Sequence, residues 1–129
     1  MTTLFEWHEY RPGESSYTKV LGPLETEIME ILWDKGTETA RGVYDSLNDG
    51  RRDLRRSTIS IMMSRLCERG LIGKNIEKGR GGLKYVYNIR VTKEQFEREI
   101  VNKIMDSLQE TFDKELRYYI QNSMTQKEV

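Results

Sequence analysis

Apolar residues recur at helical spacing in two short stretches near the start of the chain. The first stretch follows Gly22-Pro23 and stops at Gly36. Proline loses no hydrogen bond at a first helical position and glycine often ends a helix, so the pattern predicts a helix between these points. A short extended segment at 37–39 then leads to a second helix capped by Thr39. The apolar positions are Leu24, Ile28, Ile31 and Leu32 in the first helix and Ala40, Val43, Tyr44 and Leu47 in the second.

A third helix is predicted from about Arg56 to Arg69. Successive residues of a helix are rotated by about 100°, and on this basis its side chains divide between two faces. One sector is apolar, as expected for the side that packs on a core. The opposite face is mostly hydroxylic or charged, and Ile61 is an apolar residue on it. The core sector holds Ile59, Met62, Met63 and Leu66, with Cys67 at its edge; the outer face holds Ser57, Ile61, Ser64, Arg65 and Glu68, flanked by Thr58 and Ser60.

Two strands at about 71–77 and 83–89 follow this helix, joined by the glycine-rich turn Gly79-Arg80-Gly81-Gly82. Apolar and polar residues alternate in the second strand, which is the period of a half-buried hairpin. The alternating sets are Tyr85, Tyr87 and Ile89 on one side and Lys84, Val86 and Asn88 on the other.

The C-terminal part of the chain predicts a long amphipathic helical region. Thr92-Lys93-Glu94-Gln95 has the pattern of a capping box, and apolar residues then recur at intervals of three and four. The small domain before it cannot cover such a stripe, so we predict a dimer interface, formed by one helix or by two broken near Asp106-Ser107. The predicted dimerisation residues are Val101, Ile104, Met105, Leu108, Phe112, Leu116 and Tyr119.

Composition excludes several classes of protein. With a single cysteine, Cys67, and a single histidine, His8, the 129-residue chain cannot form a disulfide scaffold or a zinc site of three or four Cys and His ligands. No run approaches the ~18 apolar residues of a membrane span. We expect no metal, no cofactor and no membrane association, and a cytoplasmic location. We also expect one core with appended arms, because the chain is short for two cores.

Positive charge gathers in one segment of a chain whose formal net charge is zero. Residues 51–90 hold eleven Lys and Arg and three acidic residues, a net charge of +8, whereas 1–50 carry −6 and 91–129 carry −2. Such local asymmetry is typical of proteins that contact phosphates. The alternative for a charge run is a solvated surface, but here the run coincides with a Ser/Thr-rich helix and a glycine hairpin.

The order helix, short strand, helix, helix and hairpin is that of a winged helix-turn-helix, in which the third helix enters the major groove. We therefore predict a mainly α (α+β) fold with an N-terminal arm at 1–20, a winged-helix DNA-binding domain at 21–91 and a helical dimerisation region at 92–129. Hydroxyls and arginines suit phosphates and bases, and Ile61 suits a thymine methyl. The candidate DNA-binding residues are Arg55, Arg56, Ser57, Thr58, Ser60, Ile61, Ser64, Arg65, Lys78, Arg80 and Lys84.

Several motifs resemble the penicillinase-repressor family of bacterial and archaeal regulators. They are the segment 32–36 (LWDKG), the segments 57–59 (STI) and 64–72 (SRLCERGLI), and Tyr85-Val86-Tyr87. The resemblance implies a homodimeric winged-helix repressor that binds an inverted repeat of double-stranded DNA. Members of the family are inactivated by cleavage at an Asn-Phe bond or bind copper through a C-terminal cysteine cluster. This chain has neither feature, so the resemblance implies no inducing signal.

The sequence thus predicts a sequence-specific transcriptional regulator, a repressor, that acts as a homodimer and is not an enzyme. The alternative is a winged-helix adaptor that uses its basic face on a protein of the transcription machinery, and such an adaptor could be a monomer. The N-terminal arm either packs, for example on the dimer interface, or contacts DNA through Arg11 and Lys19. Because the arm is net acidic and rich in aromatic residues, we favour packing.

Overall fold

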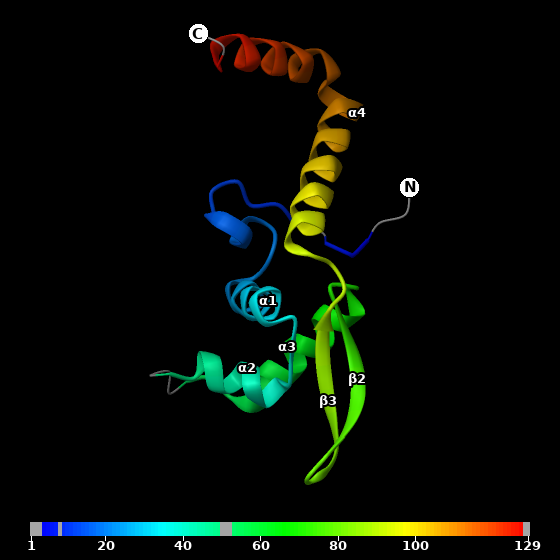
Figure 1. Cartoon of the computed structure of the whole chain (residues 1–129). Coiled ribbons are helices and arrows are strands. Elements are labelled where there is room, and N and C mark those ends of the chain that lie inside the picture. Colours follow the sequence, from blue (N-terminus) through cyan, green and yellow to red (C-terminus); the bar gives the residue numbers. More distant parts are fainter. Residues whose placement is uncertain (1–3, 8, 50–52, 128–129) are drawn as a thin grey trace. The chain divides into compact units, whose positions relative to one another are not determined.

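The computed structural model describes residues 4–7, 9–49 and 53–127 (Figure 1). His8 and two arginines of the basic segment, Arg51 and Arg52, lie outside these residues. The chain divides into two compact units, Met1–Lys93 and Glu94–Val129, and each is described by itself. The N-terminal segment belongs to the first unit, together with the predicted winged-helix domain.

The three α-helices of the first unit begin where the sequence predicts. Helix α1 spans Pro23–Lys35, α2 spans Ala40–Leu47 and α3 spans Arg56–Glu68. At the start of α1, the Gly22 N–H donates to the Glu25 carboxylate at 2.8 Å. At the start of α2, the Gly42 N–H donates to the Thr39 hydroxyl at 3.0 Å, which confirms the predicted cap.

An antiparallel sheet follows the order β1-β3-β2, with β1 at Thr37–Glu38, β2 at Ile72–Gly79 and β3 at Gly82–Ile89. Strands β2 and β3 form the wing, a hairpin that projects past α3 in Figure 1. The pairing extends one or two residues past the approximate predicted ends, to Gly79 and Gly82, and leaves a two-residue turn, Arg80-Gly81. Gly82 has a φ of 107°, a conformation that side chains rarely adopt, which explains a glycine there.

The core of the first unit lies between the helices and the base of the wing. The predicted core sector of α3 is confirmed at Ile59, Met63 and Leu66, which are fully buried, whereas Met62 is half-buried. Helix α1 also buries Met29, an apolar residue beside the stripe that the spacing identified. The other buried residues of these elements include Ile28, Leu32, Val43, Leu71, Ile72 and Tyr87.

The N-terminal segment packs on the first unit. Phe5 and Trp7 are buried, as the favoured interpretation expected. Arg11 donates to the backbone carbonyls of Thr18 and Leu21, so its guanidinium is held within the unit. A short 3-10 helix, η1, spans Ser16–Lys19 within this segment.

Arg69 joins this segment to α1 and to the end of α3. Its Nε donates to the Glu6 carbonyl at 2.9 Å, and its guanidinium pairs with the Glu25 carboxylate at 2.7 Å. The Glu6 N–H donates in return to the Arg69 carbonyl at 2.8 Å. The Arg69 and Glu25 side chains are only 23% and 16% exposed, so this ion pair is screened little by solvent.

We expect Arg69→Ala to lower the free energy of unfolding by about 1 to 3 kcal/mol, because it removes hydrogen bonds to a charged group in a partly buried site. Urea unfolding followed by circular dichroism measures the change. The matched control is Arg117→Ala, whose i,i+4 pair with Asp113 is exposed and is worth at most about 0.5 kcal/mol. Equal losses in the two variants would show that the Arg69 contacts are not stabilising.

The second unit consists of helix α4, Lys93–Lys127. Its backbone leaves the helical conformation at Phe112, with φ −125° and ψ 38°. The sequence left open one helix or two broken near Asp106-Ser107; the interruption lies at Phe112 instead, and no proline or glycine marks either place. Among the predicted dimerisation residues, Val101, Met105, Phe112 and Tyr119 are exposed, while Ile104, Leu108 and Leu116 are half-buried.

Candidate DNA-binding surface

The outer face of α3 is open to solvent. Ile61 is 53% exposed, although it is a large apolar residue in the middle of the helix. Among its neighbours on this face, Ser57 and Ser64 carry short hydroxyl side chains, and Arg65 carries a long cationic one. A helix with such a face can lie in the major groove, where hydroxyls bond base edges and apolar groups meet thymine methyls. The predicted residues Arg55, Arg56, Ser57, Thr58, Ser60, Ile61 and Arg65 are exposed, and Ser64 is half-buried.

Two arginines occupy the N-terminal end of α3. Arg55 is the N-cap residue, Arg56 is the first helical residue, and the first turn has no acidic side chain. Cations are unfavourable at this end of a helix, because the macrodipole is positive there. The same combination of positive dipole and arginines favours an anion, so this end of α3 is electrostatically suited to a phosphate group.

The wing carries the other predicted cations. Arg80 lies in the two-residue turn at its tip, and Lys78 and Lys84 lie on the strands next to it. All three are exposed. Lys78 pairs in register with Leu83 while Lys84 pairs with Glu77, so the two lysines stand on opposite faces of the hairpin. The tip therefore presents positive charge in more than one direction.

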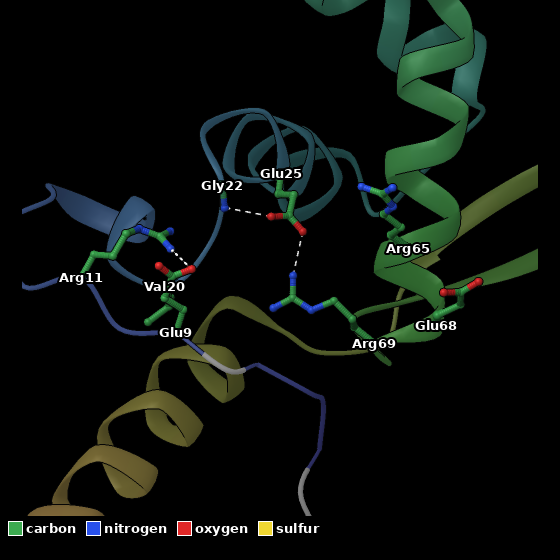
Figure 2. Close-up of a pocket in the computed structure, with 8 residues that line it drawn as sticks. All are labelled: Glu9, Arg11, Val20, Gly22, Glu25, Arg65, Glu68 and Arg69. Atoms are coloured by element: carbon green, nitrogen blue, oxygen red, sulfur yellow. Dashed lines mark hydrogen bonds and ion pairs between the residues drawn. The ribbon is translucent and has the colours of Figure 1, made fainter.

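Arg65 stands apart from the centre of the outer face. Its side chain points from α3 toward α1, beside a cavity of about 460 Å³ (Figure 2). Among the described residues its guanidinium has no hydrogen-bond or ion-pair partner. The other residues that line the cavity are Glu9, Arg11, Val20, Gly22, Glu25, Glu68 and Arg69.

Cys67 lies on the wing side of α3 and is half-buried, as its place at the edge of the core sector predicted. Burial raises the pKa of its thiol, while the nearby charges of Lys74 and Arg90 oppose that effect. A raised pKa keeps the thiol protonated near neutral pH, and the thiolate is the reactive form. The physical setting therefore favours an inert side chain over a redox sensor.

In the described part of the chain, no three His, Cys, Asp or Glu side chains are grouped so that they could hold a metal ion. None of the helices described is both long and apolar enough to cross a membrane.

The arrangement of α1, β1, α2, α3 and the wing defines a winged helix-turn-helix protein, the class of DNA-binding module that the sequence predicted. The chain belongs to the penicillinase repressor family, whose sequence profile matches residues 21–129. It is accordingly a transcriptional regulator of the winged-helix type. The N-terminal segment precedes the matched region, and a search of curated protein sequences finds no match.

Solved structures of similar arrangement include two transcription regulators of the PadR family. The one from Clostridium difficile is 15% identical, with a TM-score of 0.47, and the match covers 70% of this chain and 98% of that one. The one from Eggerthella lenta is 22% identical, with a TM-score of 0.45, and covers 70% and 81%. Stf76 from the Sulfolobus islandicus plasmid-virus pSSVx is 20% identical, with a TM-score of 0.46, and covers 59% and 92%.

Proposed function

We propose that this regulator is a repressor that binds an inverted-repeat operator as a homodimer. The observation that carries the proposal is the coincidence of an exposed hydroxylic helix face with a cationic wing, both within a segment of net charge +8. Positive charge alone would be compatible with binding to any polyanion. An exposed helix face that combines hydroxyls with Ile61 and Arg65 supports duplex DNA in particular, because the major groove admits a helix and offers base edges and thymine methyls to such groups.

In this proposal α3 lies in the major groove of one half-site. Ser57, Ser60 and Ser64 donate hydrogen bonds to phosphates or base edges, and Ile61 contacts a thymine methyl. Arg55 and Arg56 hold phosphates at the N-terminal end of the helix, where the dipole adds to their charge. Thr58 and Arg65 contact the DNA of this half-site from the side of α3 that faces α1. The planar guanidinium of Arg65 can pair bidentately with guanine or with a phosphate.

The wing makes the remaining contacts with the backbone. Arg80 enters the minor groove from the two-residue turn, where a narrow groove concentrates negative potential. Lys78 and Lys84 hold phosphates on either side of it. These contacts are sequence-independent, so they supply affinity and register while α3 supplies the discrimination between sequences.

Helix α4 forms the interface with the partner subunit. Its exposed apolar residues, such as Val101 and Met105, would be covered by the same helix of a second copy. A two-fold dimer presents two α3 helices related by the same axis, and this symmetry requires an operator whose half-sites form an inverted repeat. Repression then follows where the operator overlaps a promoter, because the bound dimer excludes the polymerase.

The roles assigned to Arg65 and Lys78 differ in a measurable way. We expect Arg65→Ala to cost about 1 to 3 kcal/mol of specific binding if its guanidinium reads a base, with little loss on random duplexes. Lys78→Ala should instead weaken binding to all duplexes alike and lower the salt slope by about 1. Fluorescence anisotropy on the operator and on random DNA, across a salt series, separates the two effects.

Each variant serves as the control for the other. An equal loss for Arg65→Ala on operator and random duplexes would contradict its base-reading role and leave it as a phosphate contact. A Lys78→Ala variant with the salt slope of the wild type would remove Lys78 from the backbone contacts.

A further inference from the structure

The wing exposes a set of large apolar side chains on one of its faces. Leu83 is 70% exposed, Ile76 is 59% exposed and Tyr85 is 51% exposed. The pairing register places them together: Ile76 lies opposite Tyr85, and Leu83 lies opposite Lys78. Residues directly opposite each other in an antiparallel pair share a face, so these side chains form one surface. The sequence predicted a half-buried hairpin, and the exposure of Tyr85 corrects that prediction for the outer part of the wing.

This face is the one that turns toward the helices. At the base of the wing it carries Ile72 and Tyr87, which are buried in the core. Lys74, which pairs with Tyr87, lies close enough to α3 for its charge to act on the Cys67 thiol. Beyond that point the hairpin projects past the helices, and the same face continues with no cover from the first unit (Figure 1). We call Lys74, Ile76, Lys78, Leu83 and Tyr85 the inner wing face.

Cations are interleaved with the apolar residues of the inner wing face. Lys74 and Lys78 alternate with Ile76 along β2, and the Lys74 ammonium lies 3.9 Å from the centre of the Tyr85 ring. The buried centre of a protein–protein interface is usually depleted of lysine, which makes a protein partner a poor match for this face. The backbone of duplex DNA has the complementary pattern, because its charged phosphates are joined by apolar deoxyribose rings.

We propose that the inner wing face binds duplex DNA through Ile76, Leu83 and Tyr85, which pack on deoxyribose rings at the edge of the minor groove. Lys74 and Lys78 hold the phosphates between those rings. The proposal rests on the proposed function and deepens it, since it assigns part of the DNA-binding energy to apolar packing on the sugars and not to ionic contacts with phosphates. Apolar side chains are among the groups that minor-groove binders press against or between nucleotides.

The double variant Ile76→Ser/Leu83→Ser tests this assignment. Both side chains are exposed in the free protein, so the thermal unfolding midpoint should not fall. Anisotropy on the operator should show an affinity lower by about ten- to a hundredfold, with the same salt slope as the wild type, because no charge is removed. The matched control is Leu4→Ser, a 52% exposed leucine outside the wing, which should bind as the wild type does.

Other outcomes overturn the proposal in distinguishable ways. If the wild type binds the operator and the double variant binds equally well, the inner wing face does not touch DNA, and the proposed function stands. If the double variant also changes the mass measured by light scattering, the face is a contact between copies of the chain. If the wild type binds no duplex above background, both the proposed function and this inference fail. Leu83→Met should keep the affinity, because it keeps the apolar contact.

Discussion

Ile61→Glu is expected to abolish operator binding without unfolding the protein. The side chain is 53% exposed at the centre of the outer face of α3, so the carboxylate is fully hydrated in the free protein and costs little stability. In the complex it would meet phosphates and base-edge acceptors at close range. Like charges brought together at an interface cost several kcal/mol, and a cost of about 3 kcal/mol lowers affinity by more than a hundredfold.

The measurement is fluorescence anisotropy on the operator, with circular dichroism to confirm the fold. Tyr10→Glu is the matched control, because Tyr10 is 46% exposed on the N-terminal segment and gains the same charge. The control is expected to bind within about threefold of the wild type, since Tyr10 is not among the proposed DNA contacts and salt screens an exposed charge. If Ile61→Glu bound as tightly as the control, α3 would not be the element that enters the groove.

The second large effect is expected in α4. Val101→Glu/Met105→Glu places two carboxylates per chain on the exposed apolar side of the helix, where Val101 is 54% and Met105 is 39% exposed. A dimer through this surface would have to bury four of them without partners. Buried, unpaired charges cost several kcal/mol each, so the dimer dissociation constant should rise by roughly a thousandfold or more. Light scattering at micromolar concentration should then report the monomer mass.

A charge-matched control is available in the same helix. Lys114→Glu changes the net charge by the same two units at an exposed position outside the apolar stripe, and it should remain dimeric. The monomeric double variant should also lose operator affinity, because only one half-site can be held at a time. A double variant that stayed dimeric would place the subunit interface somewhere other than this stripe.

Much of the first unit could be predicted from the sequence because local rules decide its elements. Gly22-Pro23 and Gly36 bound α1, Thr39 caps α2, and the two faces of α3 follow from the spacing of Ile59, Met63 and Leu66. At these positions backbone geometry, capping and burial favour the same answer. The family resemblance drawn from the motifs is confirmed by the match over residues 21–129.

The remaining features depend on contacts that no local pattern encodes. The ion pair between Arg69 and Glu25 joins residues far apart in the chain, and only the fold shows that Arg69 also bonds the N-terminal segment at Glu6. The kink at Phe112 has no proline or glycine to mark it. The alternation of apolar and polar residues in β3 suggested that Tyr85 is half-buried. The wing extends beyond the helices that cover its base, so the alternation continues where no core covers the apolar side.

The assignment of DNA contacts to individual residues, and of α4 to the dimer interface, stays a prediction. Exposure in the free subunit is necessary for these roles, and most of the predicted positions are exposed. Surface residues that bind nothing are exposed as well. Binding measurements on matched variants are therefore the means of separating the residues that read DNA from those that merely face solvent.

The most direct test is to select duplexes from a random pool with the purified protein and to measure binding of the enriched sequence by anisotropy across a salt series. Light scattering gives the mass of the complex. The proposed function predicts an enriched inverted repeat, bound by two copies of the chain far more tightly than random DNA and with an affinity that falls steeply as salt rises. No enriched sequence, or one copy on the duplex, would contradict it and favour an adaptor that binds a protein partner.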